Sequence, residues 1–137
     1  MGFGQDRFHL FGVEDLDIFI TGEKQNGDRL SQLFKNDGGN FSHVMDFTGV
    51  NFSIFSCVDI DNDSMSDLLL AGEKSSQRIT ELYKNDSSEF TQLSDNFADF
   101  SSGSSFWGDF NNDNVQDILI NGYAGGSEGY MTALYLN

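Results

Sequence analysis

Residues 67–72 read DLLLAG and decide the fold, because the same pattern stands fifty residues earlier as DIFITG (17–22) and fifty residues later as DILING (117–122). A second pattern follows each copy: LFKND at 33–37, LYKND at 82–86 and LYLN at 134–137. A third pattern, FSHV at 41–44 and FTQL at 90–93, follows the first two copies only. Ordered landmarks at one period indicate a tandem repeat.

Each repeat reads as a set of strands. The triplets 68–70 and 118–120 are apolar at consecutive positions, so we expect strands covered on both faces. Residues 79–83 alternate between apolar and polar, as half-exposed strands do. Further short strands are expected at 52–58, 104–108 and 90–93, and hairpin turns rich in Asn, Asp, Gly and Ser at 36–39 and 85–88.

Four short antiparallel strands in about fifty residues form the pattern of a β-propeller blade, and no stretch shows the sustained 3.6-residue spacing of helices. The sequence therefore predicts an all-β chain of three consecutive blades. Their expected bounds are 1–48, 49–98 and 99–137, and the last blade is expected to lack its outer strand.

Two acidic loops precede the apolar strands of the second and third units. Residues 59–67 read DIDNDSMSD and residues 109–117 read DFNNDNVQD. Oxygen-bearing side chains recur at positions one, three, five and nine, which suits a hard cation with six to eight oxygen ligands and a backbone carbonyl near position seven. The simpler interpretation is a polar turn with solvated charges, but two copies at the same place in the repeat favour a cation site.

The expected cation is Ca²⁺. Magnesium rarely uses an all-protein cage of this kind. Zinc is disfavoured because the soft ligands Cys57, His9 and His43 show no ligand spacing. An EF-hand is excluded because position twelve of each loop is apolar, Leu70 or Ile120, where that motif needs a bidentate Glu.

The loops, the apolar strand ending in Gly and the LYKND segment together resemble the FG-GAP or VCBS repeat family of integrin-α-like propeller blades, over nearly the whole chain. That resemblance implies calcium binding between the first two strands of a blade. The implied ligands are Asp59, Asp61, Asp63, the Met65 carbonyl and Asp67, and then Asp109, Asn111, Asp113, the Val115 carbonyl and Asp117.

This chain departs from the family pattern at several positions. Position six is Gly in the family but Ser64 and Asn114 here, and Asn tolerates a left-handed backbone better than Ser does. The neutral Asn111 is expected to weaken the second site. The aligned loop of the first unit, HLFGVEDLD at 9–17, is apolar at positions three and five, so we expect no calcium there unless Glu14 and Asp15 ligate in a shifted register.

Three blades cannot close a ring of four to eight. Either the chain belongs to a longer propeller, or copies assemble, with a dimer that makes a six-bladed ring as the first expectation.

Composition narrows the function. Seven basic and 22 acidic residues give a net charge of −15, which disfavours nucleic acid and anionic membranes as partners. No apolar run is long enough to span a membrane, and the start of this chain does not read as a signal peptide. The lone Cys57 cannot form an internal disulfide. The resemblance implies an extracellular or cell-surface parent protein.

No catalytic arrangement is suggested, so the chain is not expected to be an enzyme. The resemblance implies a calcium-stabilised module for protein recognition or adhesion. Two alternatives stay open: a carbohydrate-binding, lectin-like propeller, or an accessory propeller domain of a secreted polysaccharide-active enzyme. Trp107, Tyr123 and Tyr130 are candidate sugar-stacking rings, although Trp107 is better explained by packing between blades.

Overall fold

The computed structural model describes residues 15–93 and 96–137, and this part of the chain is built from strands without a helix. The expected all-β class is confirmed. The described residues form three antiparallel sheets. The first contains β1 (Ile18–Glu23), β2 (Arg29–Asp37) and β3 (Asn40–Asp46); the second β4 (Asn51–Val58), β5 (Asp67–Lys74), β6 (Gln77–Asn85) and β7 (Phe90–Gln92); the third β8 (Ser101–Gly108), β9 (Asp117–Gly125) and β10 (Gly129–Tyr135).

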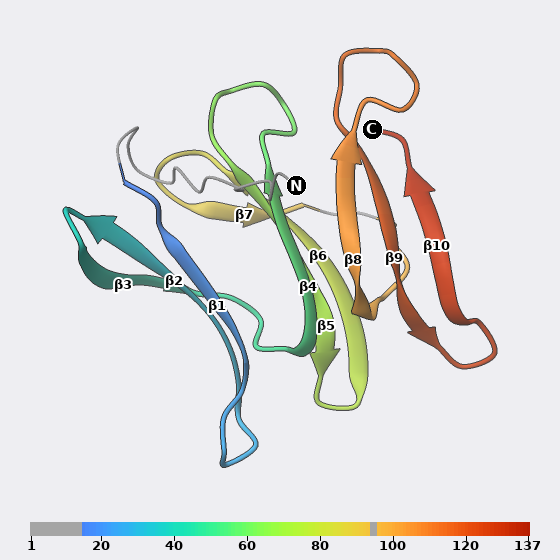
Figure 1. The fold of residues 1–137 in the computed structure, drawn as a ribbon, viewed down its shortest axis with the longest axis horizontal. Coiled ribbons are helices and arrows are strands. Elements are labelled where there is room, and N and C mark those ends of the chain that lie inside the picture. The colour runs from blue at the N-terminus through green and yellow to red at the C-terminus, as the bar shows by residue number, and fades with distance from the viewer. Residues whose placement is uncertain (1–14, 94–95) are drawn as a thin grey trace, which may run out of the picture.

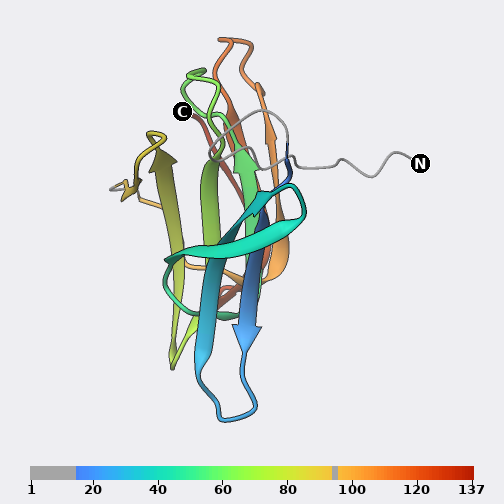
Figure 2. The same cartoon turned by 90° about the vertical axis from the view of Figure 1, so that its left-hand side faces the viewer.

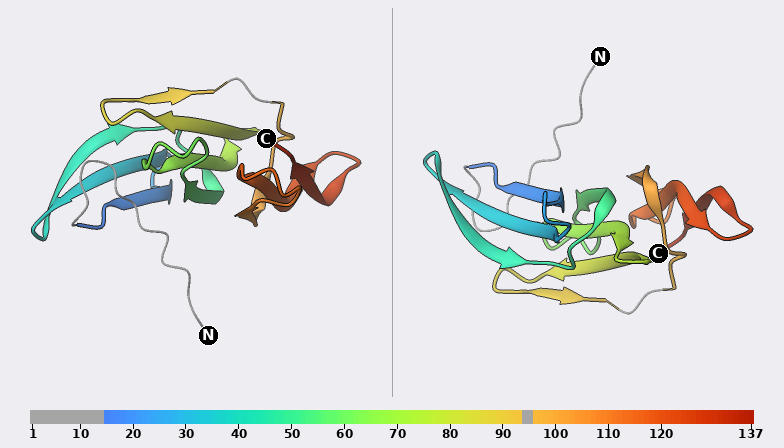
Figure 3. Two further views of the ribbon diagram at one scale, coloured as in Figure 1. Left: turned by 90° about the horizontal axis from the view of Figure 1, so that it is seen from above. Right: turned by 90° about the horizontal axis from the view of Figure 1, so that it is seen from below.

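The sheets follow one another across the molecule in chain order (Figure 1). The first lies within 1–48, the second within 49–98 and the third within 99–137. Seen from the side and from above or below, the sheets are layered one on the next, with the second in the middle (Figures 2 and 3). The described sheets do not close into a ring. No helix among the described residues has the length and apolar character to cross a membrane.

Tight turns join neighbouring strands where the sequence indicates them. In the turn between β2 and β3, Gly38 and Gly39 have φ of 60° and 91°, a left-handed conformation that costs glycine little. In the turn between β6 and β7, Ser87 has φ of 71°, and the Asp86 carboxylate accepts hydrogen bonds from the backbone of Ser88 and Glu89. Both expected hairpin turns are confirmed.

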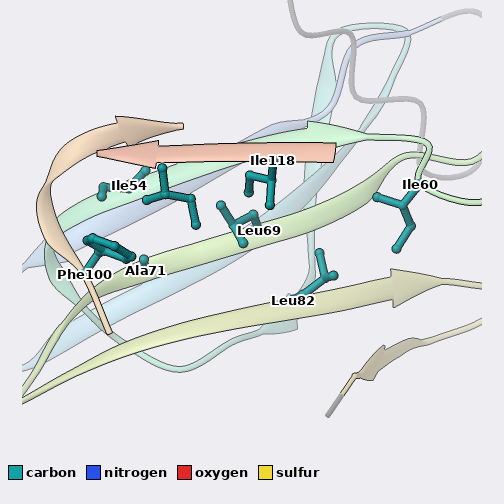
Figure 4. Close-up of a cluster of buried hydrophobic side chains, with 8 residues drawn as sticks. Ile54, Ile60, Leu69, Ala71, Leu82, Phe100 and Ile118 are labelled. Carbon is teal, nitrogen blue, oxygen red and sulfur yellow. The ribbon is translucent and has the colours of Figure 1, made fainter. Parts of the chain in front are cut away.

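Two apolar clusters hold the sheets together. Phe19 and Leu33 of the first sheet pack against Leu68, Leu70 and Tyr83 of the second. On the other side of the second sheet, a larger cluster joins it to the third (Figure 4). Its buried members are Ile54, Ile60, Leu69, Ala71, Leu82, Phe100, Ile118 and Ile120.

The middle strand β5 is covered on both faces, as predicted, with Leu68, Leu69 and Leu70 at most 2% exposed. The half-exposed character expected for residues 79–83 is partly wrong. Thr80, Leu82 and Tyr83 are all buried, because β6 lies in a sheet that has a neighbouring sheet on each side. The polar residue Thr80 is therefore buried, although apolar and polar residues alternate along the strand.

The third sheet has three described strands in the order β10-β9-β8. The first sheet also has three described strands. The part of the degenerate first loop that precedes Asp15, including His9 and Glu14, lies outside the described residues.

Candidate metal centre

The two acidic loops occupy equivalent places. Residues 59–66 connect β4 to β5, and residues 109–116 connect β8 to β9. Both loops project from the same end of their sheets, the upper end in Figure 1, one above β4 and β5 and the other above β8 and β9. Each is therefore held between the first two strands of its own sheet, and the ends of both loops are fixed by antiparallel pairing, Val58 with Asp67 and Gly108 with Asp117.

The first carboxylate of each loop organises the loop backbone. Asp59 accepts hydrogen bonds from the backbone N–H of Asp63 at 3.0 Å and of Ser64 at 2.7 Å. Asp63 in turn accepts one from the N–H of Met65 at 2.9 Å. These bonds curl the loop around its own acidic side chains.

The second loop repeats this network at the equivalent atoms. Asp109 accepts from the N–H of Asp113 at 3.0 Å and of Asn114 at 2.8 Å, and Asp113 accepts from the N–H of Val115 at 2.9 Å. Position three adds a contact of its own: Asn111 donates its side-chain N–H to the Asp113 carboxylate at 2.8 Å. Two loops with different sequences therefore adopt one conformation.

Two residues in each loop have a left-handed backbone. Position six, glycine in the FG-GAP pattern, is Ser64 with φ of 73° and Asn114 with φ of 69°. Position four is left-handed as well, at Asn62 and Asn112 with φ of 61° and 64°. The backbone that the family glycine implies is thus adopted here without glycine. Asn carries this conformation at low cost, while Ser64 is the more strained residue.

The ninth residue of each loop has a structural role that the sequence analysis missed. Asp67 is fully buried and accepts the backbone N–H of Ile60 at 2.9 Å and of Asn85 at 2.8 Å. Burial raises the pKa of this carboxyl, and the two N–H donors oppose that rise. Asp67 thereby ties its own loop to the third strand of the sheet.

The third sheet contains the same tie, and the first sheet contains its bond to the neighbouring strand. Asp117 is also fully buried and accepts the backbone N–H of Phe110 at 2.8 Å and of Asn137 at 3.0 Å. In the first sheet, Asp17 accepts the N–H of Asn36 at 2.8 Å. The signal that could have revealed this tie is the Asn that recurs in LFKND, LYKND and LYLN. Asn36 and Asn85 also donate their side-chain N–H to the carbonyls of Leu16 and Ser66, each just before the buried Asp.

The loop at 59–67 brings three carboxylates together. One oxygen each of Asp59, Asp61 and Asp67 lies within 4.8 Å of the others, the single such acidic group among the described residues. Lys84 reaches this group from β6, where its ammonium contacts Asp61 closely and lies 3.8 Å from Asp63. The bond to Lys84 lowers the pKa of Asp61, and the same bond raises the pKa of Lys84.

The loop at 109–117 differs in charge at two positions. Asn111 replaces Asp61, and Leu136 stands where Lys84 stands in the second unit. The second loop therefore lacks the acid Asp61, and its sheet lacks the base Lys84. If Lys84 is counted with the first loop, the two loops have the same formal charge. The first unit has no matching assembly among its described residues: Asp15 accepts the N–H of Gly38 at 2.9 Å and so is bonded to the β2–β3 turn.

The candidate sugar-stacking rings have different environments. Trp107 lies between the second and third sheets and donates its indole N–H to Ser56 at 2.8 Å, so it belongs to the packing. Tyr123 carries the Arg78 guanidinium over its ring at 4.6 Å. Tyr130 is 75% exposed and borders a surface hollow that is also lined by Ser102, Asn121 and Thr132.

Comparisons of the chain with protein-family models, with curated proteins and with solved structures find no match.

Proposed function

We propose that the chain is a calcium-binding repeat module of the FG-GAP/VCBS propeller type that serves protein recognition or adhesion and is not catalytic. The observation that carries this proposal is the convergence of Asp59, Asp61 and Asp67 in a loop whose backbone network recurs fifty residues later. A solvated acidic turn does not require the same curled conformation in two loops of different sequence.

The donors present fit Ca²⁺. Every candidate side-chain ligand offers oxygen, the donor that a hard cation prefers. Position nine is suitable even though its oxygens accept backbone N–H groups, because each carboxylate oxygen has two lone pairs. The proposed ligand sets are Asp59, Asp61, Asp63, the Met65 carbonyl and Asp67 in one loop, and Asp109, Asn111, Asp113, the Val115 carbonyl and Asp117 in the other.

The propeller reading is supported by three antiparallel sheets that follow one another at the repeat period and pack face to face through buried apolar residues. In such an arrangement the loops at one end of the sheets form one face of the assembly. Both acidic loops lie at that end, so calcium would rigidify a shared surface for a protein ligand, on an extracellular or cell-surface parent protein.

Direct titration tests the calcium proposal. Isothermal titration of metal-free protein with CaCl₂ should show binding, and calcium at about one hundred times the dissociation constant should stabilise the fold by about 2.7 kcal/mol per site. The double variant Asp59→Ala, Asp109→Ala should lose the binding heat. Glu128→Gln, an exposed acid on another turn, is the matched control. Absence of binding heat, with a melting temperature that excess chelator leaves unchanged, would reduce both loops to acidic turns.

One observation favours a second candidate function. The hollow beside Tyr130 combines an exposed ring with the hydroxyl and amide groups of Ser102, Asn121 and Thr132, the combination that sugars need for stacking and hydrogen bonding. A glycan array with the wild-type chain and with Tyr130→Ala separates the two candidates. Glycan signals that depend on Tyr130 would replace protein recognition with a lectin function.

A further inference from the structure

The three sheets present equivalent residues on equivalent faces. On one face, called here the leading face, β1 carries Ile18 and Ile20, β5 carries Leu68 and Leu70, and β9 carries Ile118 and Ile120, each fifty residues from the next. The pairing register extends the match to the neighbouring strand, because Ile18, Leu68 and Ile118 face Phe34, Tyr83 and Tyr135 respectively.

The leading-face residues are exposed in the first sheet and buried in the other two. Leu68 and Leu70 are 2% and 0% exposed, and Ile118 and Ile120 are 3% and 0% exposed. Ile18 and Ile20, at the same positions of the repeat, are 39% and 47% exposed. The leading face of the first sheet thus has the composition of a buried joint without a described neighbour.

On the opposite face of each sheet, called here the trailing face, the third sheet is the exposed one. Leu33 of the first sheet and Leu82 of the second are buried at 1% and 9% exposure, whereas Leu134, the equivalent residue of the third sheet, is 49% exposed. Phe106, which is on the same side of the third sheet because Leu119 pairs with both Phe106 and Leu134, is 57% exposed. The trailing face is thus covered in the first and second sheets and exposed in the third.

We propose that the trailing face of the third sheet binds the leading face of the first sheet in a second copy of this chain. The chain already makes this trailing-to-leading joint twice, from the first sheet to the second and from the second to the third. The two open faces are the two halves of the same joint. Two copies joined head to tail at both ends form a closed dimer in which six sheets make six like joints.

Charge favours this pairing over contact through other surfaces. Two copies with a net charge of −15 each repel one another where acids meet. The centres of the two open faces carry few charges. On β1 and β2 the leading face presents Ile18, Ile20, Leu30, Gln32 and Phe34, none of which is ionisable, and β3 beside them adds His43 and Asp46, which pair with Phe34 and Gln32. The trailing face presents Phe106, Leu119, Asn121, Thr132 and Leu134.

Light scattering coupled to size exclusion tests the assembly on the full 137-residue chain. The expected mass is twice 15.2 kDa. Leu134→Asp and Ile20→Lys should each give monomers with the melting behaviour of a folded protein, since both side chains are already exposed within one copy. Phe52→Asp is the matched control: Phe52 is 61% exposed on β4 of the fully covered middle sheet, and its φ of 48° suits Asp.

Mixing the two monomeric variants gives the sharper result. One joint of the mixed dimer would be entirely wild type. The other joint would contain both substitutions, with the lysine introduced by Ile20→Lys in one copy facing the aspartate introduced by Leu134→Asp in its partner, so the mixture should recover the dimer mass. A wild-type monomer at all concentrations overturns the proposal, and so does a dimer that survives both variants. Equal masses with calcium and with chelator separate this result from the calcium proposal, because the joint uses no loop residue.

Discussion

Replacing Asp67 with Ala tests whether the ninth residue of the acidic loop is a structural tie or only a metal ligand. Asp67 is fully buried, and its two oxygens accept the N–H groups of Ile60 and Asn85. Alanine removes both acceptors and offers no replacement. The substitution therefore leaves two backbone donors without their partner at a point where the loop meets the third strand.

The expected cost follows from these two groups. A buried donor that loses its partner costs about 1–3 kcal/mol, so two donors cost about 2–6 kcal/mol. That is a large share of the 5–15 kcal/mol by which domains are typically stable. The cost does not depend on calcium, because both hydrogen bonds join groups of the protein itself. The matched control is Asp63→Ala in the same loop, whose carboxylate is exposed and accepts one N–H, that of Met65.

Urea unfolding in excess chelator measures this cost. Trp107 is the single tryptophan and lies between the second and third sheets, so its fluorescence reports on their separation. We expect Asp67→Ala to lower the unfolding free energy by at least 2 kcal/mol, taking the lower end of about 2–6 kcal/mol, and Asp63→Ala by clearly less. Equal losses in chelator, or a loss for Asp67→Ala that appears only when calcium is present, would refute the structural role.

Two further predictions follow from β6. Burial, together with the hydrogen bond to Glu81, raises the pKa of Tyr83 to about 12. Tyr83 ionises near pH 10 in the unfolded chain and near pH 12 in the folded chain, so stability that is complete below pH 10 should fall by about 2.7 kcal/mol as the pH rises through 12. Urea melts of Tyr83→Phe should lack this loss, and parallel pH profiles for both proteins would contradict it. Lys84→Met removes a positive charge that contacts Asp61 and should tighten calcium binding at the 59–67 loop, because the ammonium repels a divalent cation and occupies one of its proposed ligands. Calorimetry should show no such gain for Lys84→Arg, and an unchanged affinity for Lys84→Met would show that the ammonium does not compete with the ion.

The strands and turns were predicted well because the same sequence pattern recurs in successive units. Apolar triplets at 68–70 and 118–120, with Gly two residues on, place β5 and β9 without any reference to tertiary contacts. Prediction was weaker for β6. Thr80 and Glu81 make the strand look half-exposed, but its burial is decided by sheets that come from residues far away in the chain.

The sequence predicted which acids of the loop come together, and it missed their contacts with the rest of the sheet. Acidic spacing marks Asp59, Asp61 and Asp67, since these oxygens belong to one loop. Lys84 and Asn85 belong to another strand, and only the pairing of β5 with β6 brings them to that loop. Sequence spacing carries no information about such contacts, although recurrence of the Asn in all three units was a visible sign.

Comparison of the three units also distinguishes the structural role of the ninth loop residue from its proposed role as a calcium ligand. In the first unit, positions three and five of the loop are Phe11 and Val13, which cannot ligate a cation through their side chains. Position nine is still Asp17, and it still accepts the N–H of Asn36. In the first unit the acidic spacing is therefore absent, while the bond from Asp17 to the backbone of β2 is present. The ninth residue therefore serves the sheet first, and a cation at the other two loops would use an oxygen pair that folding has already placed.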